Sequence, residues 1–249
     1  MNASMTQKQD SYEIVRGLPF LARRALVVFA VLAVLSLAIL VAGKIYGRTL
    51  VHAGHTTSLQ RFEVTIGNDG LQLPANMIRD EEQRRRGPAR RIELYLHWPT
   101  MSGFRPNLAA AFNDVSPETN AIVFISVLPR GTTHDMAGRF EAVYRKVMRG
   151  GATSAAHGLT SHALSPDYGY IGERIVFSAP DMHTGKRFVA RCQDTQSDEQ
   201  VVLAPCAMDI HFGDTLVAEI RFPSRLLGDW QMLNQALPRF LDGLLARPS

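Results

Sequence analysis

Four side chains capable of acid, base or nucleophilic chemistry lie close together in the second half of the chain. They are His157, Ser161, His162 and Asp167. A serine, a histidine and an aspartate can form a hydrolytic triad, provided that the serine stands on a strained turn within hydrogen-bonding distance of its base. The G-x-S-x-G pattern that marks one such turn is absent from the sequence. Because these residue types often occur together by chance, we assign no catalytic residues and keep a hydrolase as the alternative function.

Histidine pairs raise the question of a metal site. His52 and His55 are three residues apart, and His157 and His162 are five apart. Zinc sites need three or four ligands, and neither pair has a glutamate in a helical frame or a cysteine close by. The glycine-rich phosphate-binding patterns and the EF-hand loop are also absent from the sequence. We therefore predict no metal and no cofactor.

Arginines cluster in the first half of the chain. Six of them fall between positions 79 and 91: Arg79, Arg84, Arg85, Arg86, Arg90 and Arg91. Guanidinium groups match phosphate and carboxylate oxygens, so this cluster is a candidate site for an anionic ligand. Asp80, Glu81 and Glu82 interrupt it and leave a local charge of +3. The alternative is a solvated helix and loop in which these acids neutralise half of the arginines.

Cys192 and Cys206 are the two cysteines of the chain. Both lie at comparable places in neighbouring strand-like segments, so we predict a disulfide across a hairpin. The closed loop of fifteen residues would contribute about 3 kcal/mol in the chain-entropy model. Disulfides persist in oxidising compartments, so the prediction favours an exported domain. The alternative is a pair of free thiols buried in a cytosolic domain.

Residues 25–43 form an uncharged apolar segment ahead of some 200 further residues. A helix of this length is about 28 Å long, close to the ~30 Å hydrocarbon core of a bilayer, so the segment predicts a single transmembrane helix. A cleaved signal peptide is the alternative, but its apolar region is usually only about 7–15 residues long. Ala38 and Ala42, and Gly43 and Gly47, have the small-x-x-x-small spacing that would let two anchors associate.

Basic residues flank this segment unevenly. Lys8, Arg16, Arg23 and Arg24 precede it, and Lys44, Arg48 and Arg61 follow it. The small excess before the segment predicts a cytoplasmic tail and an exported large domain. The short anchor and the arginine-rich composition favour a bacterial inner membrane with the domain in the periplasm, although a eukaryotic luminal domain would have the same physical features.

The excess positive charge of the chain sits at the predicted anchor. The chain has 27 basic and 23 acidic residues, of which residues 1–49 hold six and two, which leaves 21 of each sign in the remainder. The large domain is therefore formally neutral. A nucleic-acid ligand would require a basic field over the folded domain, so we predict no nucleic-acid partner.

Hydrophobic alternation predicts most of the strands. A hairpin is expected where residues 59–66 lead through Asn68, Asp69 and Gly70 into residues 71–73. Residues 92–98 alternate with one buried face, and the continuous apolar segment 121–128 is typical of a central strand buried on both faces. Further strands are expected at 168–178, 188–192, 201–212 and 215–222, separated by short polar connections as in an antiparallel meander, with 194–200 as an exposed hairpin tip.

Two amphipathic helices are expected in the same domain. The first covers residues 135–148 and ends at Gly150 and Gly151. The second covers residues 224–246, with leucines at spacings of three and four and a kink at Pro238. Residues 151–166 are rich in small side chains without periodicity, so we expect a loop there. The fold class is α+β, with a mainly antiparallel sheet and two or three helices, including the C-terminal one.

The predicted organisation has four parts. They are a cytoplasmic tail (1–24), a transmembrane helix (25–43), a juxtamembrane linker (44–58) and a periplasmic α+β domain (59–249). A tethered, neutral domain without a catalytic motif favours a binding or scaffold protein that is accessory to an envelope assembly and has a protein partner there. The alternative is a membrane-tethered periplasmic hydrolase that uses the loop at 151–166.

Overall fold

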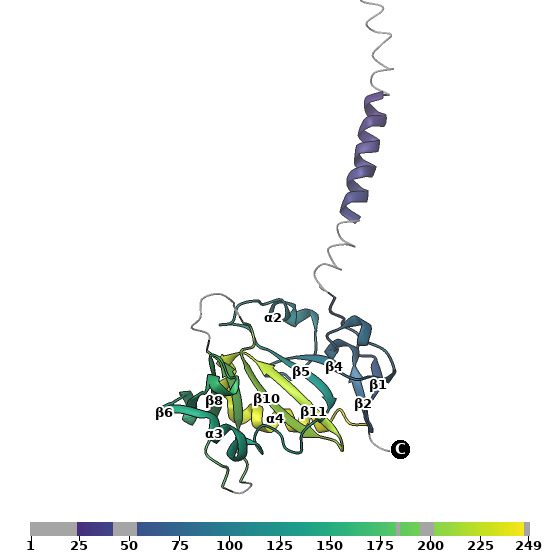
Figure 1. Ribbon diagram of the computed structural model, residues 1–249. Coiled ribbons are helices and arrows are strands. Elements are labelled where there is room, and N and C mark those ends of the chain that lie inside the picture. Colours follow the sequence, from purple (N-terminus) through teal and green to yellow (C-terminus); the bar gives the residue numbers. More distant parts are fainter. Residues whose placement is uncertain (1–23, 42–53, 183–184, 195–201, 247–249) are drawn as a thin grey trace, which may run out of the picture. The chain divides into compact units, whose positions relative to one another are not determined.

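The computed structural model describes residues 24–41, 54–182, 185–194 and 202–246. The chain divides into two units, Met1–Ala53 and Gly54–Ser249. The described part of the first unit is a single helix, Arg24–Val41, which is long and apolar enough to cross a membrane (Figure 1). A signal sequence near an N-terminus would meet the same criterion, so the transmembrane assignment remains a prediction.

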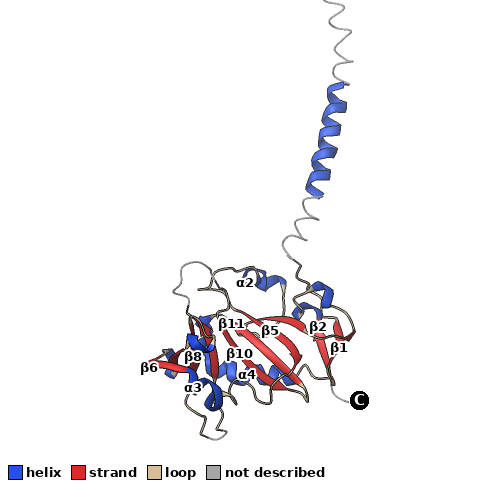
Figure 2. Cartoon of the chain, viewed as in Figure 1, coloured by secondary structure: helices blue, strands red, loops and turns tan. Residues whose placement is uncertain are grey.

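An eight-stranded antiparallel sheet forms the centre of the second unit (Figure 2). Its strands, in spatial order, are β4 (Ile92–His97), β5 (Ile122–Pro129), β11 (Leu216–Phe222), β10 (Cys206–Phe212), β9 (Val189–Gln193), β8 (Glu173–Phe177), β7 (Thr160–Leu164) and β6 (Met148–Ser154). Strands β6 to β11 follow one another as neighbours, and β5 and β4 extend the sheet beyond β11. The predicted antiparallel meander is confirmed, and the predicted hairpin tip lies outside the described residues except for Asp194.

A smaller sheet carries the predicted hairpin. Its strands are β1 (Arg61–Ile66), β2 (Asp69–Pro74) and β3 (Gly87–Pro88), in the order β2-β1-β3. Ile66 pairs with Asp69, so the loop consists of Gly67 and Asn68, one position earlier than expected. Gly67 has φ 60°, a conformation that a glycine adopts without strain in a two-residue hairpin loop.

Four α-helices are present among the described residues. Besides the N-terminal one they are α2 (Ala109–Phe112), α3 (Arg145–Val147) and α4 (Trp230–Asp242). A π-helical turn, Phe140–Tyr144, precedes α3, and a 3-10 helix, Ser224–Asp229, precedes α4. Shorter 3-10 helices lie at Ala75–Met77, Glu81–Gln83, Pro106–Leu108, Ala156–Gly158 and Pro166–Tyr168. This arrangement confirms the α+β class with a C-terminal helix.

The core lies on one face of the large sheet. Leu94, Ile125, Ile220 and Met208 are cross-strand partners in successive strands and therefore share that face. Every fourth residue of α4 joins the same buried cluster, namely Leu233, Leu237 and Leu241. The predicted leucine stripe is therefore confirmed as core. The α-helix starts later than predicted, at Trp230, and continues through Pro238 to Asp242.

Strand β5 is not buried on both faces. Val123, Ile125 and Val127 are buried toward the core, whereas Phe124, Ser126 and Leu128 on the other face are only partly buried. The reason is that β5 is the second strand from the edge, and its opposite face is covered only in part. A separate small cluster of Tyr95, Phe104 and Ile122, with Phe112 of α2 against it, covers one end of that face.

Two predictions between residues 135 and 166 are wrong. The expected helix 135–148 is reduced to the π-helical turn and α3, and Met148 already begins β6. The expected loop 151–166 contains the end of β6 and all of β7. Strand β6 is one of the two edge strands of the large sheet, and six of its seven residues are exposed. A strand without a buried face lacks the alternation from which strands are predicted.

Candidate functional site

The disulfide Cys192–Cys206 lies where the large sheet nearly separates into two halves. Strand β10 pairs with β11 over seven residues, but with β9 only through Cys206 with Cys192 and Ala207 with Arg191. The two cysteines have a Cα–Cα distance of 4.0 Å and are bonded, which confirms the predicted disulfide. One half of the sheet is thus β4-β5-β11-β10, the other is β9-β8-β7-β6, and a short ladder and one covalent bond join them.

A pocket of about 470 Å³ opens where this ladder ends. One side is formed by Val189 of β9 and by residues 208–212 of β10, and α4 contributes Asn234, Gln235, Pro238 and Asp242. The remaining lining residues are Asp135, Ala137, Asp181, Lys186 and Arg187. The position of the pocket follows from the topology, because the backbone of β10 runs on past Ala207 without β9 beside it.

A second pocket, of about 490 Å³, continues the first along α4. Asp181, Lys186, Asn234 and Gln235 line both pockets. The second is completed by Ser178, Ala179, Pro180, Met182, Trp230 and Gln231. We call the two together the α4 groove. It runs between α4 and the connection from β8 to β9.

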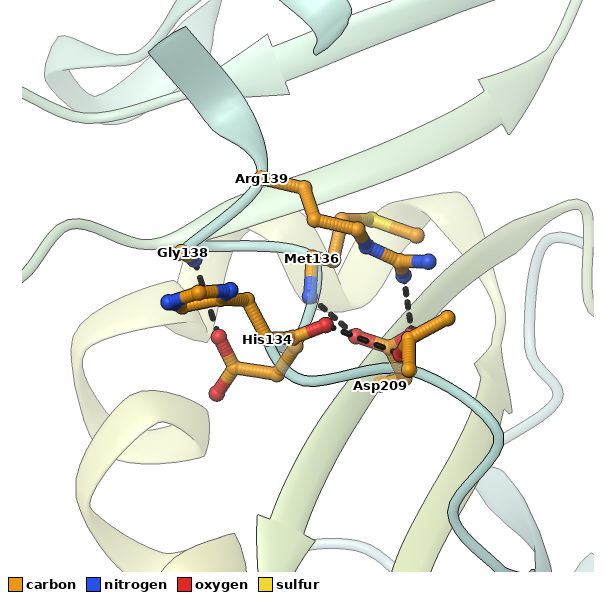
Figure 3. A network of polar contacts seen from close by, with 7 residues as sticks. His134, Met136, Gly138, Arg139 and Asp209 are labelled. Carbon is orange, nitrogen blue, oxygen red and sulfur yellow. Dashed lines mark hydrogen bonds and ion pairs between the residues drawn. The ribbon is translucent and has the colours of Figure 1, made fainter. Parts of the chain in front are cut away.

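Asp209 anchors the segment that borders the first pocket (Figure 3). Its carboxylate accepts hydrogen bonds from the backbone N–H of Met136 and from Nη2 of Arg139. Asp135 accepts a hydrogen bond from the N–H of Gly138 at 2.9 Å. Both carboxylates therefore have structural partners.

Arg187 is also held in place. Its Nη2 lies 3.2 Å from Oε1 of Glu141, and its guanidinium carbon lies 4.2 Å from the centre of the Phe140 ring.

Amide side chains of α4, at Gln231, Asn234 and Gln235, line the groove beside these charged groups. Amides both donate and accept hydrogen bonds, so this lining suits a ligand with alternating donors and acceptors. Within the described residues, no three His, Cys, Asp or Glu side chains gather closely enough to hold a metal ion.

The four residues considered for a hydrolytic site do not form a triad. Ser161 and His162 are successive residues of β7, so their side chains point to opposite faces of the sheet. The Ser161 Oγ is buried and has no hydrogen-bond partner in the described structure, and the same is true of His162 Nδ1. Asp167 accepts a hydrogen bond from Ser165 at 3.1 Å. The backbone carbonyl of His157 accepts one from the Trp230 indole at 3.0 Å.

His55 and His97 also have separate surroundings. His55 Nδ1 lies 2.9 Å from the hydroxyl of Tyr95, and its ring stacks on Phe104. Burial raises the pKa of Tyr95, although nearby Arg84 and Arg79 oppose the rise. Burial lowers the pKa of His97, and the charge of Arg225 acts in the same direction. His52 and His183 lie outside the described residues.

The structure separates the arginine cluster into two groups. Arg84 donates hydrogen bonds to the carbonyls of Ile78 and Gly54, Arg79 lies 5.3 Å from the centre of the Phe124 ring, and Arg91 pairs with Glu93. Arg85, Arg86 and Arg90 are exposed, as Arg79 and Arg91 are, but the described part of the chain gives them no ion pair, side-chain hydrogen bond or ring contact. The expected helix is a single 3-10 turn, Glu81–Gln83, capped by Asp80. Three of the six arginines thus stabilise the fold.

Comparisons with known proteins give distant likenesses only. No protein family matches the sequence, and no curated protein matches it. An immunity protein of the Stenotrophomonas maltophilia type IV secretion system is similar at 16% identity, with a TM-score of 0.48 over 78% of this chain and 96% of that chain. The Neisseria meningitidis iron-regulated outer membrane lipoprotein FrpD is similar at 8% identity, with a TM-score of 0.47 over 77% of this chain and 95% of that chain. Likenesses this distant carry no argument about function.

Proposed function

We propose that this chain is a single-pass protein of the bacterial inner membrane whose periplasmic domain binds a protein partner as an accessory or scaffold component of an envelope assembly. The α4 groove is the proposed binding site. The observation that carries the proposal is the continuity of the two pockets along α4, with four residues common to both. A groove of this kind accommodates an extended polypeptide better than a single compact ligand.

The chemistry of the lining supports a peptide ligand. Each pocket has a volume within the range of about 300–1,000 Å³ found for small-molecule sites, but such sites are lined mostly by apolar side chains. Here about half of the lining side chains are polar, among them amides, carboxylates and a lysine, which suits the N–H and C=O groups of a peptide backbone. Trp230 and the 97% exposed Met182 add apolar contacts at one end. Aromatic residues and methionine are enriched at protein interfaces.

Two further observations support the location. The helix Arg24–Val41 has 18 residues and a mean hydropathy of 2.7, which is long and apolar enough to cross a membrane. The disulfide Cys192–Cys206 requires an oxidising compartment to persist, and the periplasm is one. Together they favour a tethered, exported domain.

Site-specific photo-crosslinking in the full-length protein tests the groove. A photoreactive amino acid replaces Gln231 or Gln235, which are both exposed on α4. A third variant carries it at Ser154, which is exposed on the edge strand β6. We expect one and the same adduct from both α4 positions and none from Ser154.

A substitution that obstructs the groove tests whether the crosslinked partner lies inside it. Asn234→Trp places a large ring where both pockets meet, so it should abolish the adduct formed from Gln235. The matched variant Ser154→Trp should leave the adduct unchanged. Equal adducts from all three labelled positions, or an adduct that persists in Asn234→Trp, would show that the partner does not occupy the groove.

A further inference from the structure

The arginine-rich segment is fastened to the place where the chain enters the globular domain. Gly54 is the first residue of the second unit. Its carbonyl accepts a hydrogen bond from Nη2 of Arg84 at 2.8 Å, and the same nitrogen donates to the carbonyl of Ile78 at 3.1 Å. One guanidinium therefore holds the incoming chain against the segment 79–91, which we call the arginine loop.

Within the arginine loop, three arginines are available for a ligand. Arg79, Arg84 and Arg91 have the internal contacts described above, whereas the exposed side chains of Arg85, Arg86 and Arg90 have no ion pair or side-chain hydrogen bond in the described structure. One carboxylate oxygen of the neighbouring Asp80 already has a hydrogen-bond partner, because its Oδ1 accepts the N–H of Glu82 at 3.1 Å. The three free guanidinium groups thus stand out on a domain that is neutral as a whole.

Chain connectivity limits how far this loop can lie from the predicted anchor. Twelve residues, 42–53, separate the helix Arg24–Val41 from Gly54. Even a fully extended chain of that length spans only about 40 Å. Because Arg84 contacts Gly54, the arginine loop lies beside the residue at which the chain from the helix enters the domain.

We propose that Arg85, Arg86 and Arg90 bind the phosphate groups of anionic lipids and hold the domain against the membrane surface. The proposal rests on the membrane anchoring proposed above. A guanidinium group donates two parallel hydrogen bonds to a phosphate, and a membrane with anionic lipids attracts basic groups within about a Debye length of its surface. The contact would fix which side of the domain faces the bilayer.

Fluorescence quenching in nanodiscs tests this contact with the full-length protein. The only two cysteines are bonded to each other, so one introduced cysteine is the single site for a thiol-reactive fluorophore. Thr65→Cys places it on the exposed side of β1, where Thr65 pairs with Pro88 of the arginine loop. Ser154→Cys places it on β6, at the other edge of the large sheet from β4. The quencher is a nitroxide on the lipid headgroups.

We expect quenching at Thr65→Cys in discs that contain phosphatidylglycerol, and much less in discs of phosphatidylcholine alone. Quenching at Ser154→Cys should stay low in both. High salt should reduce the quenching at Thr65→Cys, because it screens the attraction between headgroups and guanidinium groups.

Two variants that remove the same charge at different places test which arginines bind the lipid. The triple variant Arg85→Gln, Arg86→Gln, Arg90→Gln should lower the ratio of surface-bound to released domain by about fivefold per arginine, or about 100-fold in all. The control triple variant Arg149→Gln, Arg174→Gln, Arg239→Gln removes the same charge from three exposed positions elsewhere and should have little effect.

The outcomes separate this proposal from the one on which it rests. A protein that fails to insert into either kind of disc would contradict the membrane anchoring. A protein that inserts but is quenched equally in both lipid compositions would contradict lipid binding by the arginine loop and leave the anchor intact. Equal loss of quenching in the two triple variants would show that only the net charge matters and would overturn the assignment to these three arginines.

Discussion

At the scale of single residues, Asp69 joins the small sheet to the large one. It lies at the start of β2 and is only 8% exposed. Its Oδ1 accepts the N–H of Asp214 at 2.8 Å, and its Oδ2 accepts the N–H of Thr215 at 2.9 Å and the Thr215 hydroxyl at 2.6 Å. One carboxylate therefore organises the turn between β10 and β11. Gly213 in that turn has φ 56°, and a Cβ there would lie 2.6 Å from Oδ1 of Asp69.

These contacts predict a specific loss of stability in acid. Burial alone would raise the pKa of Asp69, but the hydrogen bonds from Thr215 and Asp214 outweigh it and hold the pKa below its ordinary value. A carboxyl group with a lowered pKa stabilises the fold at pH values above its unfolded pKa of about 3.9, and that stabilisation is lost as the pH falls through the folded pKa. Asp69→Asn should lower the free energy of unfolding by about 2–3 kcal/mol at neutral pH.

Urea unfolding at a series of pH values measures this effect. The difference between the wild type and Asp69→Asn should begin to shrink below about pH 4, where the carboxyl group of the unfolded chain takes up a proton, and should vanish as the pH falls through the lower pKa of the folded state. Asp242→Asn, at an exposed position of α4, is the matched control and should follow the wild type throughout. A constant difference between the wild type and Asp69→Asn down to the lowest pH would contradict the role of the charge.

At the scale of elements, the weak point of the sheet is the ladder between β9 and β10. Only two residue pairs join these strands, and one of them is the disulfide Cys192–Cys206. By comparison, β8 and β9 pair over five residues. The covalent bond therefore compensates for hydrogen bonds that the diverging strands do not make, and it keeps the two sides of the α4 groove together.

Removal of the disulfide should destabilise the domain by about 2–5 kcal/mol. The free energy of unfolding is measured for the double variant Cys192→Ser, Cys206→Ser and for the wild type in its reduced and oxidised forms. The comparison separates the loss of the bond from the effect of the substitutions. Hydrogen exchange should accelerate first in β9 and in the part of β10 beyond Ala207. Free, alkylatable thiols at both positions in protein taken from its native compartment would contradict the bond itself and remove one support for the periplasmic location.

The sequence predicts elements where one face is buried and fails where none is. Alternating or helical apolar patterns identified β1, β4, β10, β11 and α4, because each buries a regular set of side chains. Strands β6 and β7 were missed, since β6 is exposed along nearly its whole length. The α4 groove could not be predicted either, because it combines residues from Asp135 to Asp242 that meet only after the sheet has formed. The arginine cluster was visible in the sequence, but its division into bound and free side chains depends on Gly54, Ile78 and Phe124.

At the scale of the whole molecule, the predicted topology has residues 1–24 in the cytoplasm and the globular domain in the periplasm. Alkaline phosphatase folds to an active form only where its disulfides can form, so a fusion after Ser249 should be active. The same fusion point with a reporter that works only in the cytoplasm should give no signal. Activity of the cytoplasmic reporter alone would reverse the orientation and contradict the periplasmic location.

The fate of the anchor is a separate prediction. We expect the mature protein to retain residues 25–43, because an uncharged segment of this length exceeds the usual apolar region of a signal peptide. The intact mass of protein extracted from membranes measures this directly. A product that begins near Lys44 would show that the segment is a cleaved signal and that the domain is released.

The two halves of the large sheet also differ in how the chain builds them. The half made of β6 to β9 is one continuous stretch, Met148 to Gln193, placed between β5 and β10, and both of those strands border β11. The other half, β4-β5-β11-β10, and the helix α4 come from the chain on either side of that stretch. The arrangement is that of a host fold with an inserted module. Because the module supplies one wall of the α4 groove and the host supplies the other, exchange of the module alone would change the lining of the groove and leave the host's own lining residues in place.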